Sequence, residues 1–151
     1  MNKIFYLLPL LMLLSGCFND NNAQLNNLYD DGDKQADSLL EGAEYIEFLY
    51  KQQRGGVMVS SAGRIAKLLE NQQSPYIAQV ILIRLSSGRK LLIKHNIEKA
   101  NAVPKLVVGE TLTFSGTYRW NSNGGMILST YQQADKPQYS GWLKYQNTLY
   151  Q

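Results

Sequence analysis

The stretch from Tyr76 to Asn96 constrains the fold most strongly. Two apolar runs, at 77–85 and 89–96, flank a short Ser-Ser-Gly turn at 86–88. This pattern is typical of a β-hairpin. The runs are rich in β-branched and large aliphatic residues, which suits strands that are buried on at least one face. A run as long as 77–85 spans about 30 Å when extended, enough for a central strand of a small barrel. The sequence therefore predicts a mainly β fold built around this hairpin.

Three further strands are predicted on either side of the hairpin. The first covers Val57 to Leu68, with Gly63 as a bend or bulge site. Residues 110–120 alternate with a period of two between large side chains and small or polar ones, as in a strand with one face in the core. A turn rich in Asn and Gly at 121–125 then leads into a fifth strand from Met126 to Tyr131.

Two helices complete the predicted domain. An N-terminal amphipathic helix starts at Ser38, where Ser38 and Glu41 form a capping box, and the Gly-Gly pair at 55–56 ends it. Its apolar face is expected to cover the barrel. A second, short helix is predicted to be capped by Asn96 and to end before Pro104.

The order of these elements predicts the fold class. Three strands, a short helix and two more strands is the order of the OB-fold, a five-stranded barrel. We therefore expect a mainly β, five-stranded OB-fold-like barrel with an N-terminal amphipathic helix and a short helix between strands three and four. An SH3-like barrel is the alternative, but it lacks a helix at that position.

The N-terminus predicts where the protein is located. Lys3 precedes an apolar run of eleven residues at 4–14, which is shorter than the roughly 20 residues of a membrane-spanning helix and typical of a secretory signal peptide. Leu14-Ser15-Gly16-Cys17 resembles the bacterial lipoprotein box. That resemblance implies cleavage before Cys17 and acylation of Cys17 with fatty acids such as palmitate. An ordinary secretory signal with a chance cysteine is the alternative.

The residue after the cysteine bears on sorting within the envelope. Phe18 stands there instead of Asp, and by resemblance to other bacterial lipoproteins this favours the outer membrane. We therefore expect a lipid-anchored protein on the periplasmic side of the bacterial outer membrane. Cys17 is the only cysteine, so no disulfide is predicted.

The predicted organisation is a signal peptide at 1–16, an acidic disordered tether at 17–37, and a barrel domain with its helix at 38–151. Charge follows this division. Residues 18–50 contain eight acids and one lysine, a net charge of −7, and residues 51–151 contain thirteen lysines and arginines and four acids, a net charge of +9. The plain interpretation is a solvated surface and a soluble linker. The alternative is a basic body that is attracted to anionic polymers or lipid headgroups.

Three segments resemble a bacterial family of short OB-like envelope proteins, the domain-of-unknown-function 3465 family. They are Leu92–Ile97, Gly116–Asn121 followed by Gly124-Gly125, and Gly141–Lys144. The resemblance covers 44–151 and implies a fold class but no reaction.

One departure from the family pattern concerns histidines. The pattern has a His-His-Asp-Pro-like segment after strand five and another His after the Gly-Trp pair. Here Thr130-Tyr131-Gln132-Gln133 and Tyr145 stand at those positions. The resemblance therefore implies that any histidine-based chemistry of the relatives is lost in this chain.

Little in the sequence supports catalysis. His95 is the only histidine, and we expect it to be a hydrogen-bonded residue at the end of strand three. The carboxylates of the basic body are dispersed, so neither a metal site nor a cofactor is predicted. The alternative is an enzyme, or a degenerate enzyme, centred on His95 with Asn96, Thr130 and Tyr131.

The favoured function is a non-enzymatic binding module. OB barrels commonly bind oligonucleotides or oligosaccharides through aromatic and basic side chains, and this body interleaves the two, with Lys90, Lys94, Arg119 and Lys144 near aromatic residues. The expected site is the side of strands two, three and five together with the C-terminal tail. The predicted ligand-binding residues are His95, Asn96, Arg119, Trp120, Thr130, Tyr131 and Trp142.

The expected ligand is an anionic or polar component of the envelope. An anionic glycan, lipopolysaccharide or another envelope protein fits the expected location, and nucleic acid is not favoured there. Three alternatives stay open. Trp120 and Trp142 could be a core residue and a barrel plug, the protein could be an enzyme, or it could be a structural partner in an envelope complex.

Overall fold

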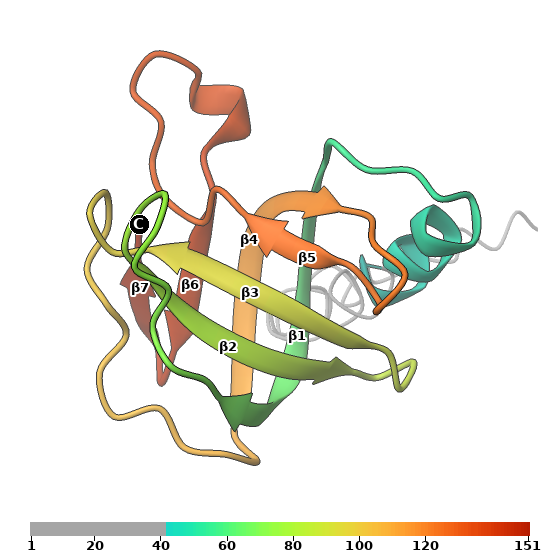
Figure 1. Cartoon of the computed structure of the whole chain (residues 1–151), viewed down its shortest axis with the longest axis horizontal. Helices are drawn as coiled ribbons and strands as arrows, with labels where there is room; N and C mark the ends of the chain where they lie inside the picture. The colour runs from blue at the N-terminus through green and yellow to red at the C-terminus, as the bar shows by residue number, and fades with distance from the viewer. Residues whose placement is uncertain (1–41) are drawn as a thin grey trace, which may run out of the picture. The chain divides into compact units, whose positions relative to one another are not determined.

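A computed structural model describes residues 42–151 (Figure 1). The predicted signal peptide, Cys17, the tether and the capping box at Ser38 and Glu41 lie outside these residues. Residues 42–51 are helical, and within the described residues no helix is long and apolar enough to cross a membrane. The remaining elements are β1 (Val57–Leu68), β2 (Ala78–Leu85), β3 (Lys90–Asn96), β4 (Thr111–Arg119), β5 (Met126–Leu128), the 3-10 helix η2 (Pro137–Tyr139), β6 (Trp142–Tyr145) and β7 (Thr148–Tyr150).

Five strands close into a barrel in the order β1-β2-β3-β5-β4, with β4 pairing back to β1 (Figure 1). The β3–β5 pair is parallel, and the other pairs of the ring are antiparallel. Closure depends on β1, which is twelve residues long. Its first part pairs with β4 from Val57 onward, and its last part pairs with β2. This topology confirms the predicted OB-like barrel.

The bend in β1 differs in position from the prediction. The register with β2 shifts between Ile65 and Lys67, so the bulge lies after Gly63 rather than at it. Gly63 instead begins the two-residue stretch, Gly63 and Arg64, in which β1 pairs with both neighbours, and it lies opposite Leu85 and Leu112. A Cβ at Gly63 would lie 2.9 Å from the carbonyl oxygen of Arg84. Glycine is needed here because the strands approach closely.

The core is made by the inward positions of the alternating strands. Tyr118 and Phe114 of β4 are the largest fully buried side chains. Tyr118 is therefore a core residue. The other large aliphatic side chains of the strands that are fully buried are Ile65, Ile81, Ile83, Leu91, Ile93, Leu112, Ile127 and Leu143.

The N-terminal helix covers one end of the barrel, as the sequence predicted. Ala43, Ile46 and Leu49 are fully buried and belong to the same apolar cluster as the barrel core. Their spacing places them on one face of a helix. Gly42 in this helix lies against β1, where a Cβ would overlap the carbonyl oxygen of Ser60. The close approach accounts for a glycine at a helical position where it costs stability.

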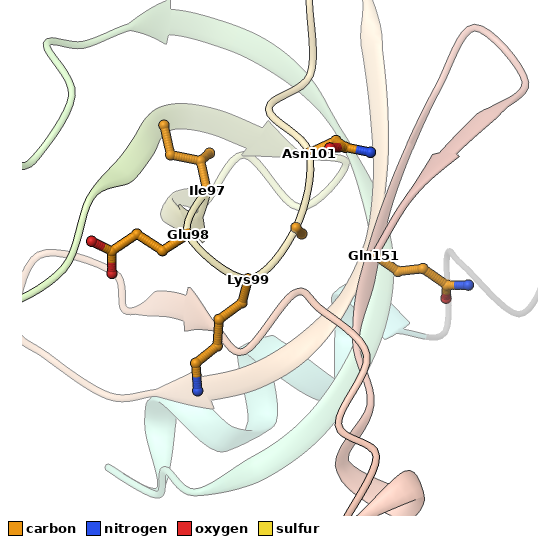
Figure 2. A pocket seen from close by; sticks show the side chains of 6 residues that line it. Ile97, Glu98, Lys99, Asn101 and Gln151 are labelled. Carbon is orange, nitrogen blue, oxygen red and sulfur yellow. The ribbon is translucent and has the colours of Figure 1, made fainter.

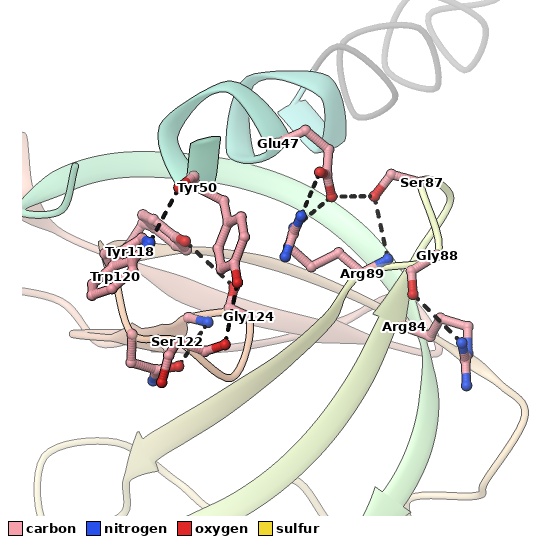
Figure 3. A network of polar contacts seen from close by, with 12 residues as sticks. Glu47, Tyr50, Arg84, Ser87, Gly88, Arg89, Tyr118, Trp120, Ser122 and Gly124 are labelled. Carbon is pink, nitrogen blue, oxygen red and sulfur yellow. Dashed lines mark hydrogen bonds and ion pairs between the residues drawn. The ribbon is translucent and has the colours of Figure 1, made fainter. Parts of the chain in front are cut away.

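A polar network fastens this helix to the loops at its end of the barrel (Figure 3). The guanidinium of Arg89 donates two hydrogen bonds of 2.6 Å to the carboxylate of Glu47 and lies 3.5 Å from the ring centre of Tyr50. The hydrogen bond from Arg89 lowers the pKa of Glu47. The indole N–H of Trp120 donates to the carbonyl oxygen of Tyr50 at 3.1 Å. Since this network joins three segments distant in the sequence, it fixes where the helix sits.

The predicted short helix between β3 and β4 is not formed. Asn96 does cap a turn, because its side-chain oxygen accepts from the N–H of Glu98 at 3.0 Å and its carbonyl oxygen accepts from Ala100 at 3.1 Å. The chain leaves after this single turn because Val103 is buried in the core. The side-chain amide of Gln79 holds the backbone of Val103 with two hydrogen bonds of 2.9 Å.

The C-terminal part also differs from the prediction. β5 ends at Leu128 rather than Tyr131, and Ser129, at φ 55°, redirects the chain. The tail then forms the hairpin β6–β7, which the sequence did not predict. β6 pairs with β4 where β5 has left it, with Leu143 opposite Phe114. The tail thereby adds to the sheet outside the five-stranded ring.

Replacing Ile46 with alanine tests the role of the helix. We expect Ile46→Ala to lower the free energy of unfolding by about 2–5 kcal/mol, because it leaves a cavity where the helix meets the barrel. Phe48→Ala is the matched control on the same helix, since Phe48 is 48% exposed. Urea denaturation of both variants measures the difference. Equal effects would contradict a helix that closes the barrel.

Candidate functional site

The predicted site residues lie in two parts of the molecule. His95, Asn96, Thr130 and Tyr131 gather where β3 and β5 end, and Trp142 is next to them at the start of β6, half-buried. The N–H of Gly141, just before Trp142, donates to the carbonyl oxygen of Tyr131 at 2.9 Å. By contrast, Arg119 and Trp120 lie at the helix-covered end, where Trp120 is half-buried and bonded to the helix. The structure therefore brings together five of the seven predicted residues.

His95 is a structural connector at this end of the barrel. Its side chain is fully buried, with Nδ1 2.7 Å from Oγ1 of Thr130 and Nε2 3.0 Å from the carbonyl oxygen of Asn101. A carbonyl only accepts, so Nε2 donates the ring proton and Nδ1 accepts from the Thr130 hydroxyl. Burial lowers the pKa of His95 and favours this neutral form. Neither ring nitrogen faces solvent, so the geometry does not support an enzyme centred on His95.

Tyr145, at the position where the resemblance implied a histidine in relatives, makes another structural contact. Its hydroxyl donates to the carboxylate of Glu110 and accepts from the N–H of Val107 at 3.2 Å. The hydrogen bond to Glu110 raises the pKa of Tyr145. This contact holds the loop before β4. Within residues 42–151, three or more potential metal ligands from His, Cys, Asp and Glu do not come together.

A polar cleft of about 410 Å³ opens beside this end of the barrel. We name it the Tyr131 cleft. The ammonium of Lys99 lies 5.0 Å from the ring centre of Tyr131. A second hollow of about 260 Å³, lined by the turn at 97–101 and by Gln151, shares Lys99 with the cleft (Figure 2). The cleft itself is lined by Lys99, Tyr131, Gln132, Gln133, Ala134, Asp135 and Lys136.

Basic side chains gather on the outer face of β1, β2 and β3. Arg64 pairs with Arg84, and Arg84 pairs with Lys90, so three cations lie side by side across three strands. On the same face, Lys67 lies opposite Leu82 of β2, and Lys94 lies opposite Val80 of β2. We name this surface the cationic face. It consists of Arg64, Lys67, Arg84, Lys90 and Lys94.

Alternation along the strands explains the direction of these side chains. Ile65, Ile83 and Leu91 fill the core, so the residues next to them in sequence point outward. Half-buried Leu82 and Leu92 pair with each other in the middle of the cationic face. The face therefore combines an apolar centre with flanking positive charge.

The cationic face has no carboxylate partner in the described part of the chain. The one salt bridge there joins Arg89 to Glu47. Arg64 and Arg84 donate to backbone carbonyls at 2.9 Å and 3.4 Å, and Lys94 donates to the side chain of Gln72 at 2.9 Å. Like charges directly opposite each other on neighbouring strands repel and destabilise a sheet. An anion bound here would relieve that repulsion.

The sequence predicted only part of this surface. Lys90 and Lys94 were expected near the site, whereas Arg64, Lys67 and Arg84 were missed. A signal for Arg84 was present, because it and Lys90 stand on either side of the hairpin turn at outward positions. The contribution of β1 depends on its register with β2, which the sequence pattern does not reveal.

Comparison with known protein families gives one match. Residues 33–151 match the sequence model of a family described as protein of unknown function (DUF3465). A search of curated proteins found no match. The matched region includes all the described strands and every residue of the Tyr131 cleft and the cationic face.

Titration of His95 predicts how stability depends on pH. Because burial lowers the folded-state pKa, the unfolded chain takes up the proton first as the pH falls through the ordinary range near 6.5. We expect the free energy of unfolding to decrease by less than about 1 kcal/mol between pH 7.5 and pH 6. His95→Gln should remove this slope, since the chain has no other histidine. Urea denaturation at the two pH values measures it, and an unchanged slope in the variant would contradict the assignment.

Proposed function

This chain belongs to the DUF3465 family of proteins of unknown function, and from that premise we propose that it is a non-enzymatic binding module for an anionic ligand of the bacterial envelope. The observation that supports the proposal is the cationic face. Its five basic residues share one side of the sheet and have no carboxylate partner among residues 42–151. Such a surface raises the local concentration of anions and speeds their association.

The charge of the body favours the same ligand class. Residues 42–151 contain thirteen lysines and arginines and six acids, a net charge of +7. Two of those acids are occupied, Glu47 with Arg89 and Glu110 with Tyr145. The six carboxylates balance fewer than half of the thirteen basic groups, which leaves a net positive charge for a partner.

The layout of the cationic face favours an extended ligand over a single small anion. Neighbouring strands lie about 4.8 Å apart, so the row from Arg64 through Arg84 to Lys90 presents charges at regular intervals. Lys67 and Lys94 extend the charge along the strands, beside the apolar pair Leu82 and Leu92. Anionic glycans and lipopolysaccharide carry repeated charges on a partly apolar framework, and the proposed ligand belongs to this class.

The proposal includes a lipid anchor. The lipoprotein box at Leu14–Cys17 supports acylation of Cys17, and the acidic stretch at 17–37 would space the barrel from the membrane. Two or more acyl chains anchor a protein far more firmly than one. In this arrangement the cationic face is held close to the envelope components that it binds.

Reversing two charges on the cationic face tests the proposed function. We expect Lys67→Glu with Lys90→Glu to weaken binding of lipopolysaccharide by about tenfold or more at low salt and to flatten its salt dependence, since two ionic contacts are lost. Lys51→Glu with Arg54→Glu, at the end of the helix, is the matched control. Titrations with lipopolysaccharide, peptidoglycan fragments and single-stranded DNA compare the ligand classes. Flat, salt-independent signals for all three with the unmodified protein would overturn the proposal.

Substitution of the cysteine tests the anchor. Cys17→Ser should abolish incorporation of labelled palmitate and release the protein from the membrane fraction. Phe18→Asp is the matched control, because it should keep the label while moving the protein from the outer to the inner membrane. Both are measured by metabolic labelling and membrane fractionation. An unlabelled wild-type protein would contradict the lipoprotein assignment.

A further inference from the structure

We infer that the Tyr131 cleft is a carbohydrate subsite, which takes one hydroxylated ring of the envelope glycan whose charged groups lie on the cationic face. The inference deepens the proposed function by naming the ligand class, and it rests on that function for the charged part of the ligand. Four observations carry it: the chemistry of the lining, the free polar groups, the aromatic ring and the path from the cationic face.

The lining offers donors and acceptors in similar measure. Lys99 and Lys136 donate, Asp135 accepts, and the side-chain amide of Gln132 does both. A sugar ring presents hydroxyls that also donate and accept. A site for a bare anion would not place a carboxylate among its ligands, because the two charges would repel. The cleft volume of about 410 Å³ is within the range of small-molecule sites.

Three polar side chains of the cleft are unpaired, whereas the loop that carries them is held in place. The side chains of Gln132, Asp135 and Lys136 have no hydrogen bond or ion pair to any other described residue. The loop itself is held at Gln133, whose N–H donates to Oγ of Ser140 at 2.9 Å and whose amide donates to a carbonyl oxygen at 2.8 Å. Because the loop backbone is already held in place, less conformational entropy is lost when a ligand binds to its unpaired side chains.

The ring of Tyr131 supplies the apolar contact that a sugar needs. Tyr131 is half-buried and lines the cleft. A tyrosine presents an apolar face together with a polar edge, which matches the C–H face and the hydroxyl rim of a pyranose. The ammonium of Lys99 lies over one face of the ring, 5.0 Å from its centre, and adds a donor there, which leaves the other face for stacking on a sugar.

A chain of contacts joins the Tyr131 cleft to the cationic face. Lys94 of that face donates to the side chain of Gln72 at 2.9 Å, and the amide of Gln72 donates to the carbonyl oxygen of Tyr76 at 3.4 Å. Lys94 also directly precedes His95 in β3, and Nδ1 of His95 lies 2.7 Å from Oγ1 of Thr130, the residue before Tyr131. One extended ligand therefore reaches both surfaces without leaving the protein.

The test uses neutral tetrasaccharides, so that the cationic face contributes little. Chitotetraose and maltotetraose are titrated by calorimetry into the full-length lipidated protein in detergent micelles. We expect at least one of them to bind with little dependence on salt. Tyr131→Ala should weaken that binding by about tenfold, the size of a lost aromatic stacking contact. Tyr139→Ala should leave it unchanged, because Tyr139 is an exposed aromatic of the same loop outside the cleft.

A second variant covers the case in which Tyr131→Ala disturbs the loop. Ala134→Trp fills the cleft while Tyr131 and its packing stay in place, and it should also abolish binding of the neutral sugar. The inference is overturned if neither tetrasaccharide binds, or if sugar binding survives Ala134→Trp. It is also overturned if single-stranded DNA binds in the cleft in place of the sugar. Lys67→Glu with Lys90→Glu should leave neutral-sugar binding intact, so failure of the cationic face and failure of the subsite are distinguishable.

Discussion

The pairing of β1 with both β2 and β4 is the contact on which the rest of the structure depends. One long strand serves two neighbours, and its pairings with them overlap at Gly63 and Arg64. A side chain at Gly63 would collide with the opposing backbone. Once the ring is closed, each strand has a defined inner and outer face. The apolar residues of the hairpin then fill the interior, and Arg84 and Lys90 are forced to the outside next to Arg64. Closure of the barrel thereby creates the cationic face.

Both ends of the barrel are filled by the protein itself. At one end the helix inserts Ile46 and Leu49 and is held by the Glu47–Arg89 pair. At the other end Val103 enters the core, and His95 ties β3 to the flanking segments through Thr130 and Asn101. Because both ends of the barrel are filled and its histidine is engaged in structure, we propose that ligand recognition takes place on the outer surface. This is the physical basis for preferring a binding module over an enzyme.

The proposed ligand surface combines two kinds of interaction. The cationic face supplies long-range attraction that salt weakens, and repulsion among its own charges favours an anionic partner. The Tyr131 cleft supplies short-range contacts that depend on shape and hydrogen bonding. A ligand that uses both gains attraction from the first and selectivity from the second. The proposed lipid anchor at Cys17 would keep this surface close to the envelope.

Elements that depend on local pattern could be predicted from the amino-acid order alone. Alternation specified β4, and two apolar runs around a Ser-Ser-Gly turn specified the β2–β3 hairpin; these strands and β1 were predicted to within about two residues. Their order indicated the barrel. Asn96 was recognised as a cap. Only the tertiary structure decided that Val103 enters the core, so that one turn replaces a helix, and that the C-terminal tail pairs with β4. It also decided the row of Arg64, Arg84 and Lys90, since register joins residues that are far apart in the chain. Local preferences act over a few residues, whereas register and packing depend on strands that meet only after the barrel has closed.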